Sequence, residues 1–292
     1  MDSIYLDHAA TTPVRDEVVA SMEAYMSRIF ANPSSHHGPG RRARAVLESA
    51  REEIADSLGA RRSEIRFVRG GTESDNLAVL GACRAAKRRF GTPPRLFVSA
   101  VEHSAVLEAA EHADTREEAR LSLLSVSPDG TVDLDALEGE GTGDAGEAGA
   151  EPPPVASVMW VNNETGLILP VAEVVRAALG SSATVHTDAS QAVGKVPVNI
   201  AQVRVDLLTA TGHKIGGPRG VGILYVRDGV ELEPLIFGGG QERALRPGTE
   251  DVAGAVGLAA AIRLAVAEEE VAGASMDRRR RRLEEGLRAG ID

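Results

Sequence analysis

The amino-acid sequence predicts an α/β fold in which a mainly parallel, seven-stranded-type sheet is sandwiched by helices. Short apolar runs typical of buried strands alternate with longer segments whose apolar residues recur at three- and four-residue spacings, as in a helix. Such alternation is typical of a parallel sheet covered on both faces. In addition, polar segments follow several of the apolar runs, where loops at the carboxyl edge of the sheet would lie.

Two helices are expected near the start of the chain. The first covers residues 14–30 and follows Pro13, which suits the opening of a helix. The second covers residues 41–58 and ends at Gly59.

The remaining elements alternate along the chain. Expected strands occupy residues 65–68, 95–98, 156–161, 184–186, 206–208 and 222–226. Further expected helices occupy residues 76–89, 105–113, 171–179 and 276–291. Residues 139–154, rich in Gly, Ala, Glu and Pro, are expected to form a mobile surface loop.

Composition narrows the class of protein. The 292-residue chain is long enough to bury a large core, and its hydrophobic content of 43% is ordinary for a globular protein. A net charge of −11 argues against direct binding of nucleic acid, since phosphate binding needs a basic surface. A single cysteine, Cys83, suits a reducing compartment, and no signal peptide or membrane-spanning stretch is recognisable. We therefore expect a soluble, cytoplasmic protein that acts away from membranes.

Polar segments follow five of the predicted strands. They are residues 69–76, 99–104, 162–166, 187–191 and 209–214. Taken singly, each has an ordinary structural interpretation: Asp188 could cap a helix, His103 could be a surface histidine, and Lys214 could be a solvated loop charge. Because a parallel sheet gathers the carboxyl ends of its strands at one edge, five such segments together favour a binding crevice.

The side chains of that crevice fit one cofactor, pyridoxal phosphate, which needs an amine, a phosphate cup, a carboxylate for its pyridine nitrogen and a stacking group. Lys214 offers the amine for a Schiff base, and Asp188 offers the carboxylate. Gly71 and Thr72, at a predicted helix N-terminus, would form the cup, and His103 would stack on the ring. A metal site is not expected, because the histidines lack paired ligand spacing and there is no cysteine pair.

The identity of Lys214 supports this interpretation. Lysine occurs only at positions 87, 195 and 214, although arginine is abundant, so solubility alone would not require a lysine here. A guanidinium stays protonated and cannot form an imine, whereas a lysine amine can lose its proton and attack an aldehyde.

Eight stretches of the sequence resemble, in order, motifs of the cysteine desulfurases, fold type I enzymes of the class V aminotransferase group. The stretches are YLDHAATTP (5–13), NPSSHHGPG (32–40), GGTESDNLA (70–78), VEHSAVL (101–107), VNNETG (161–166), HTDASQAVGK (186–195), TGHKIGGPRGVG (211–222) and GGGQERALRPGTEDV (238–252). The resemblance implies a pyridoxal-phosphate enzyme that converts L-cysteine to L-alanine and passes the sulfur on as a persulfide, for iron–sulfur cluster, thio-cofactor or tRNA biosynthesis.

The resemblance also implies roles for residues around the cofactor ring. Lys214 would form the covalent link to the cofactor and shuttle protons, and His103 would stack on the ring and assist acid–base steps. Asp188 would pair with the ring nitrogen. Gln191 and Asn163 would lie near the ring hydroxyl.

Further residues would hold the cofactor phosphate. The resemblance implies that Gly71, Thr72, Thr211 and His213 bind it from the same chain. Thr249, in RPGTED, would reach the phosphate of the other subunit, so the active unit would be a homodimer. A sulfur-acceptor or scaffold protein would be a further partner.

The sequence departs from the family pattern near its end. We expect a large cofactor-binding domain at residues 1–262, with an N-terminal arm at 1–13, and a helix at 263–292 that leads into an incomplete small domain. The family places a nucleophilic cysteine loop and a substrate-binding arginine in that small domain, but the chain stops before either. We therefore expect a fragment or a natural short form that binds the cofactor better than it transfers sulfur. Cys83, at an apolar helix position, is expected to be a buried structural thiol.

Two other functions remain open from the sequence. One is a selenocysteine lyase or another class V aminotransferase-like enzyme that needs no cysteine. The other is a non-catalytic cofactor-binding scaffold that dimerises and holds a sulfur acceptor. The sequence indicates neither the acceptor nor the preference between sulfur and selenium.

Overall fold

A seven-stranded sheet organises the computed structural model, which describes residues 4–138, 151–179 and 182–291. The strands are β1 (Ile65–Val68), β2 (Arg95–Ser99), β3 (Arg120–Leu124), β4 (Val155–Ser157), β5 (Thr184–Asp188), β6 (Leu207–Thr211) and β7 (Gly222–Val226). Their order across the sheet is β1-β7-β6-β5-β4-β2-β3. All neighbours from β6 to β3 are parallel, and β7 runs antiparallel to both β1 and β6. The prediction of a mainly parallel sheet is therefore confirmed.

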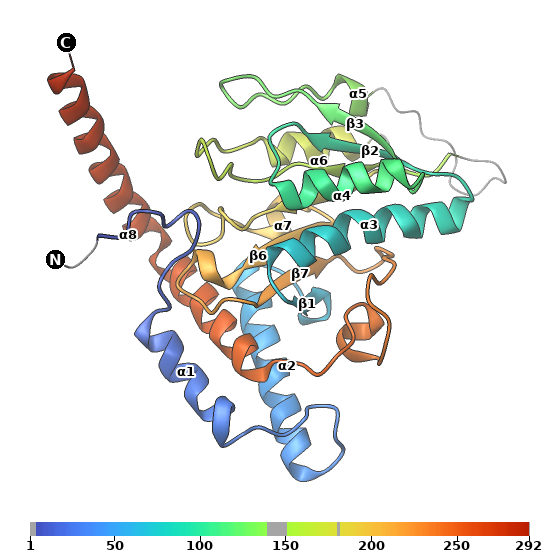
Figure 1. The fold of residues 1–292 in the computed structure, drawn as a ribbon, viewed down its shortest axis with the longest axis vertical. Coiled ribbons are helices and arrows are strands. Elements are labelled where there is room, and N and C mark those ends of the chain that lie inside the picture. Colours follow the sequence, from blue (N-terminus) through green and yellow to red (C-terminus); the bar gives the residue numbers. More distant parts are fainter. Residues whose placement is uncertain (1–3, 139–150, 180–181, 292) are drawn as a thin grey trace.

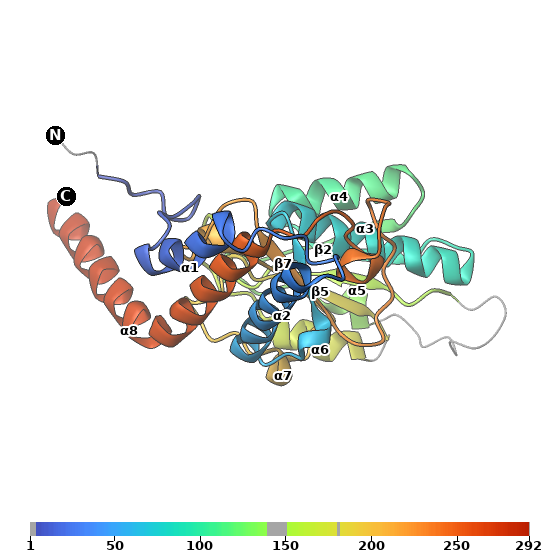
Figure 2. The same cartoon turned by 90° about the horizontal axis from the view of Figure 1, so that it is seen from below.

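Helices cover both faces of this sheet, also as predicted. The α-helices are α1 (Asp16–Ser27), α2 (Gly38–Leu58), α3 (Gly71–Phe90), α4 (Ser104–Thr115), α5 (Asp135–Glu138), α6 (Val171–Leu179), α7 (Ile200–Val203) and α8 (Val252–Gly290), and short 3-10 helices are η1 (Arg62–Glu64), η2 (Gly212–Lys214) and η3 (Gln241–Ala244). α3 and α4 lie on one face, and α6 and α7 lie on the other (Figures 1 and 2). α1 and α2 both pack against α8.

Successive strand residues belong to two different hydrophobic cores. In β7, Ile223 packs in the core shared with α2, α6 and α8, whereas Leu224 packs in the core beneath α3 and α4. Phe97 and Val98 of β2 divide in the same way. Alternate side chains of a strand point to opposite faces, and here both faces are covered. This explains why the strands read as continuous apolar runs in the sequence.

The structure contains elements that the sequence did not predict. β3 pairs with β2 at the edge of the sheet, and only Leu124 of its five residues is buried, so its apolar signal is weak. α8 runs without a break from Val252 to Gly290, across the expected domain boundary at residue 262. The division into two domains therefore stays a prediction. The expected surface loop at 139–154 lies mostly outside the described residues, which resume at 151.

The long helices begin and end where local chemistry favours it. His37 caps α2, its Nδ1 accepting a hydrogen bond from the backbone of Gly40 at 3.2 Å, and Gly59 ends the helix with φ 70°. Asp251 caps α8 by accepting from Gly254 N at 2.9 Å. In the described part of the chain, no helix is both long and apolar enough to cross a membrane.

Candidate active site

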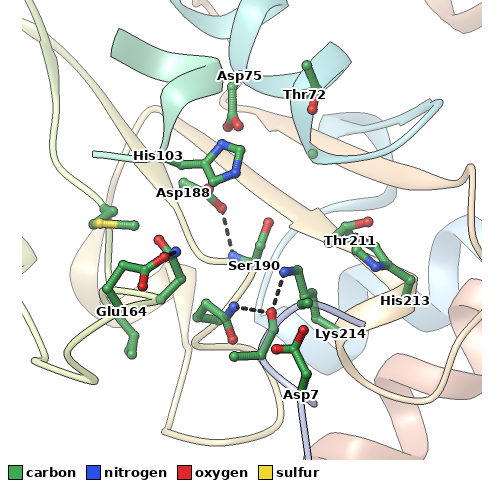
Figure 3. Close-up of a pocket in the computed structure, with 17 residues that line it drawn as sticks. Asp7, Thr72, Asp75, His103, Glu164, Asp188, Ser190, Thr211, His213 and Lys214 are labelled. Carbon is green, nitrogen blue, oxygen red and sulfur yellow. Dashed lines mark hydrogen bonds between the residues drawn. The ribbon is translucent and has the colours of Figure 1, made fainter. Parts of the chain in front are cut away.

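A cavity of about 570 Å³ lies at the carboxyl ends of β1, β2, β4, β5 and β6 (Figure 3). The structure brings nine of the sequence-predicted site residues into its wall, namely Gly71, Thr72, His103, Asn163, Asp188, Gln191, Thr211, His213 and Lys214. Thr249 is exposed on the segment before α8 and does not line this cavity. The remaining wall residues come partly from the N-terminal segment, which contributes Asp7, Ala9 and Ala10.

The turn from β1 into α3 forms one wall of the cavity. Gly70 precedes the helix with φ 116°, and no side chain of the described residues caps the helix. Ser74, in the first turn of this helix, is buried, and its Oγ donates to Ile223 O at 3.0 Å. A Cβ on Gly222 would lie 3.0 Å from the Cα of Gly70, so position 222 needs a glycine for the turn to pack against β7. The uncapped N–H groups at Gly71 and Thr72 suit an anion such as a phosphate.

Asp188 ends β5 and is only 7% exposed. Its Oδ1 accepts a hydrogen bond from Ser190 N at 2.8 Å. Burial raises the pKa of Asp188, whereas the neighbouring Ser190 and the charges of His103 and Lys214 oppose that rise. A cation within the cavity, such as a protonated pyridine nitrogen, would best stabilise a buried carboxylate in this position.

Two further buried acids, Glu102 and the cavity-lining Asp75, were not predicted from the sequence. Glu102 accepts hydrogen bonds from Ser99 Oγ at 2.5 Å and from Met159 N at 2.6 Å, and burial raises the pKa of Glu102 to about 8. Burial, together with the negative charge of Asp188, also raises the pKa of Asp75. Among the described residues, neither Asp75 Oδ1 nor Glu102 Oε2 has a hydrogen-bond partner. Glu102 therefore holds its proton near neutral pH, and burial favours the neutral form of Asp75 as well.

His103 precedes α4 and caps it. Its Nδ1 accepts a hydrogen bond from Ala105 N at 3.1 Å. Because the backbone group is the donor, Nε2 must carry the proton when the ring is neutral. Figure 3 shows the imidazole beside Asp188, where it can cover a ring or exchange a proton through Nε2.

Lys214 is the last residue of η2, directly after β6. Its Nζ donates to the carbonyl oxygen of Ala9, which also accepts from Gln191 Nε2 at 2.8 Å (Figure 3). Burial lowers the pKa of Lys214, although Asp188 and Asp7 act in the opposite direction. A lowered pKa makes the neutral amine, the form that attacks a carbonyl carbon, easier to reach.

The N-terminal segment is attached to the loop that carries Lys214. Thr12 N and Oγ1 both donate to His213 O, at 2.7 and 2.9 Å, and Thr12 Oγ1 accepts from Gly216 N at 2.7 Å. His213 Nδ1 lies 3.2 Å from Thr11 Oγ1, and burial lowers the pKa of His213. The imidazole is therefore neutral near pH 7 and available as a hydrogen-bonding group.

An unpartnered hydroxyl supports a phosphate-bearing ligand in the cavity. Ser190 Oγ is buried, lines the cavity and has no hydrogen-bond partner in the described part of the chain. A Cβ on Gly71 would lie 3.4 Å from this oxygen, so the hydroxyl is close to the uncapped helix end. Together with the carboxylate of Asp188 and the amine of Lys214, these groups match the charges and donors that pyridoxal phosphate needs. Ser190 was missed because serine is common after strands.

Cys83, by contrast, is not part of the site. It lies within α3 with no exposed surface, and burial raises its pKa to about 12. The expectation of a buried structural thiol is therefore confirmed.

Comparison with known proteins places this geometry in a family. The sequence matches the class-V aminotransferases over residues 4–292. It is 45% identical over 290 residues to the IscS-like cysteine desulfurase of Mycobacterium tuberculosis, covering 99% of this chain and 72% of that protein.

Solved structures agree with the sequence match. A NifS-like protein superposes with a TM-score of 0.88 at 36% identity, covering 99% of this chain and 76% of the other. A structure of SspA in complex with cysteine superposes with a TM-score of 0.79 at 36% identity, covering 89% of this chain and 72% of the other. These relatives favour a desulfurase over the two alternatives left open by the sequence. The chain belongs to the class-V aminotransferase family of pyridoxal-phosphate enzymes and, within it, to the cysteine desulfurases.

Proposed function

We propose that this chain binds pyridoxal phosphate in the cavity at the sheet edge and acts there on L-cysteine, releasing L-alanine. The observation that carries the proposal is the cavity wall itself, in which a lysine amine, a buried carboxylate and an uncapped helix N-terminus lie together. The relative that was solved with cysteine bound supports this choice of substrate.

Each wall group would hold a different part of the cofactor. The α3 N-terminus at Gly71 and Thr72, with Thr211 and His213, would bind the phosphate. Asp188 would face the ring nitrogen. Pyridoxal phosphate bound in this way would supply an electron sink for the amino acid.

The remaining groups would orient the cofactor and move protons. Asn163 and Gln191 would face the ring hydroxyl, and the His103 imidazole would cover the ring. Lys214 Nζ would hold the cofactor and then accept and return a proton at the substrate Cα. His103 Nε2, which carries the proton of the neutral ring, would donate to the departing group.

The sulfur step needs a thiol from outside these 292 residues. Cys83 is the sole cysteine of the sequence, and it is buried with a raised pKa. We therefore propose that the sulfur passes, as a persulfide, to a thiol outside these 292 residues, whether on a further part of the same protein or on an acceptor protein. We also propose that this sulfur is used in the cytoplasm, for the biosynthesis of iron–sulfur clusters, thio-cofactors or thiolated tRNA.

A homodimer would complete the site. Thr249 is exposed and lies outside the cavity of its own chain, as expected of a residue that serves a second copy. We propose that it binds the cofactor phosphate of the other subunit, and that residues 1–262 form the cofactor-binding domain.

The proposal is tested by incubating the protein with pyridoxal phosphate, L-cysteine and dithiothreitol. We expect alanine and sulfide in equal amounts, and no alanine without the cofactor. Protein that binds the cofactor but forms no alanine from L-cysteine would contradict the substrate assignment. Faster turnover of L-selenocysteine than of L-cysteine would instead favour a selenocysteine lyase.

A further inference from the structure

The segment after β5 brings a second lysine next to the candidate active site. It forms consecutive helical turns, in which Val193 N donates to Ala189 O and Val196 N donates to Ala192 O, both at 3.0 Å. Residues four apart in such turns lie on the same side. Gln191 and Lys195 have this spacing, and Lys195 Nζ donates to Gln191 Oε1 at 2.5 Å.

This segment is held in place by α8. Gly194 has φ 71°, and a Cβ at this position would clash with Ala265 of the helix. The turn that precedes Lys195 therefore has little freedom to move. Its rigidity fixes the backbone from which both Gln191 and Lys195 extend.

Lys195 is not explained as a surface charge. It is half-buried, and in the part of the chain that the structure describes it forms no ion pair with an acid. It lines a cavity of about 430 Å³ with His8, Arg15, Lys214 and Glu268, in which Glu268 already accepts two hydrogen bonds from Arg15, at 2.7 and 2.9 Å. Burial, and secondarily the charge of Lys214, lowers the pKa of Lys195 to about 8. Partial burial of the Lys195 ammonium costs stability, because the charged group loses contact with water.

Two hydrogen bonds, one to each end of the group, orient the side-chain amide of Gln191. A lysine ammonium has donors and no acceptor, so the amide must turn its oxygen towards Lys195. The amide nitrogen then points the other way, where Nε2 donates to Ala9 O at 2.8 Å. Gln191 lines the site cavity and is only 8% exposed, so its orientation decides whether the wall offers a donor or an acceptor.

We propose that Lys195 is a positioning residue that locks the Gln191 amide with its NH₂ group directed to the cofactor cavity. The locked amide presents a hydrogen-bond donor to a ligand oxygen and so favours an oxygen that carries negative charge. Without Lys195, only the hydrogen bond to the Ala9 carbonyl oxygen holds the amide in this orientation, so the amide rotates more readily and presents its oxygen part of the time. This inference rests on the proposed binding of pyridoxal phosphate.

A double-mutant cycle tests it through cofactor binding and absorbance. Lys195→Met removes the donor and keeps most of the side-chain volume, and we expect it to weaken pyridoxal-phosphate binding roughly 10-fold, the cost of a charge-assisted hydrogen bond. The midpoint of the pH-dependent absorbance change of the bound cofactor should move upward, because the negatively charged ring oxygen loses its donor. Lys195→Arg, which also has only donors, should restore most of the affinity.

The cycle is completed in a Gln191→Ala background, where Lys195→Met should change the cofactor affinity less than about two-fold, because the amide is already gone. Equal losses in both backgrounds, or no loss in either, would overturn the inference. Lys87→Met is the matched control: it removes the same charge from α3, where Lys87 donates to Glu117 O at 2.5 Å, and should bind like wild type. An equal loss in this control would also overturn the inference, since net charge would then explain the effect. Wild-type protein that fails to bind the cofactor would contradict the proposed function instead.

Discussion

The two ends of the candidate site respond to burial in opposite ways. At one end, Asp75 of α3, Glu102 after β2 and Asp188 of β5 are buried and have raised pKa values. At the other end, Lys195 after β5 and Lys214 after β6 are half-buried and have lowered pKa values. Desolvation favours the neutral form of a group, so it retains protons on the acids and removes them from the amines.

The difference shows which end depends on a ligand. At the acid end, Glu102 Oε1 joins the loop after β2 to Met159 through hydrogen bonds, although Glu102 Oε2 and Asp75 Oδ1 have no partner among the described residues. The lysine end instead uses the carbonyl oxygen of Ala9 as an acceptor for both Lys214 and Gln191. We therefore expect substitutions at the lysine end to affect chemistry most, and substitutions at the acid end to affect the pH dependence of stability.

The largest effect is expected for Lys214→Ala. Removing the amine should abolish the covalent attachment of the cofactor and lower alanine formation from L-cysteine at least about 1000-fold. The measurements are the visible absorbance of the cofactor after dialysis and the rate of alanine formation, with circular dichroism to confirm folding. Lys87→Ala, on α3 and outside the cavity, should behave like wild type. Absorbance and rate unchanged in Lys214→Ala would show that the amine is not the attachment point.

A smaller effect, on stability, is expected for Glu102→Gln. The pKa of Glu102 is about 8 in the folded protein, compared with an ordinary 4.5 when unfolded, so the folded state binds the extra proton between these values. The free energy of unfolding of wild type should therefore fall as pH rises from about 4.5 to 8, with a contribution from this residue of up to about 1.4 kcal/mol per pH unit.

Gln at position 102 cannot ionise, but its oxygen can still accept from Ser99 and Met159. Urea unfolding at several pH values should therefore show a shallower decline for Glu102→Gln, with the remaining slope due to other buried acids such as Asp75. Glu108→Gln, at an exposed position on α4, should leave the decline unchanged. Identical slopes for wild type and Glu102→Gln would indicate that Glu102 is ionised in the folded protein.

The smallest effect is expected for Asp7→Asn. Asp7 raises the pKa of Lys214, so neutralising it should lower that pKa and make the free amine available at a lower pH. The rate of cofactor attachment is measured by stopped-flow absorbance across the pH range, and the midpoint of its pH profile should move to lower pH. The shift should be smaller than for Asp188→Asn, because Asp188 has the larger effect on the pKa of Lys214. Asp16→Asn, on α1 and outside the cavity, is the control. A shift to higher pH in Asp7→Asn would contradict this account.

Much of the site could be predicted from the sequence because its chemistry follows strand ends. Lys214 and Asp188 each come directly after a recognisable apolar run, and Gly71 combines a strand end with a helix start. Lys195 also carried a signal, as one of very few lysines and four residues after Gln191, but a charged residue at that spacing is usually solvated.

The sequence by itself determined the alternation of strands and helices, the polar residues at the strand ends and the resemblance to a family, since all three depend on local order along the chain. Only the tertiary structure decided that Asp75 and Glu102 are buried, that Ser190 is unpartnered and that Lys195 meets Gln191 instead of an acid. It also decided that α8 continues from the core into solvent and that β3 pairs at the sheet edge. The physical reason is that burial and pairing depend on segments far apart in sequence, whereas the propensity and period of a strand or helix are set by its nearest neighbours.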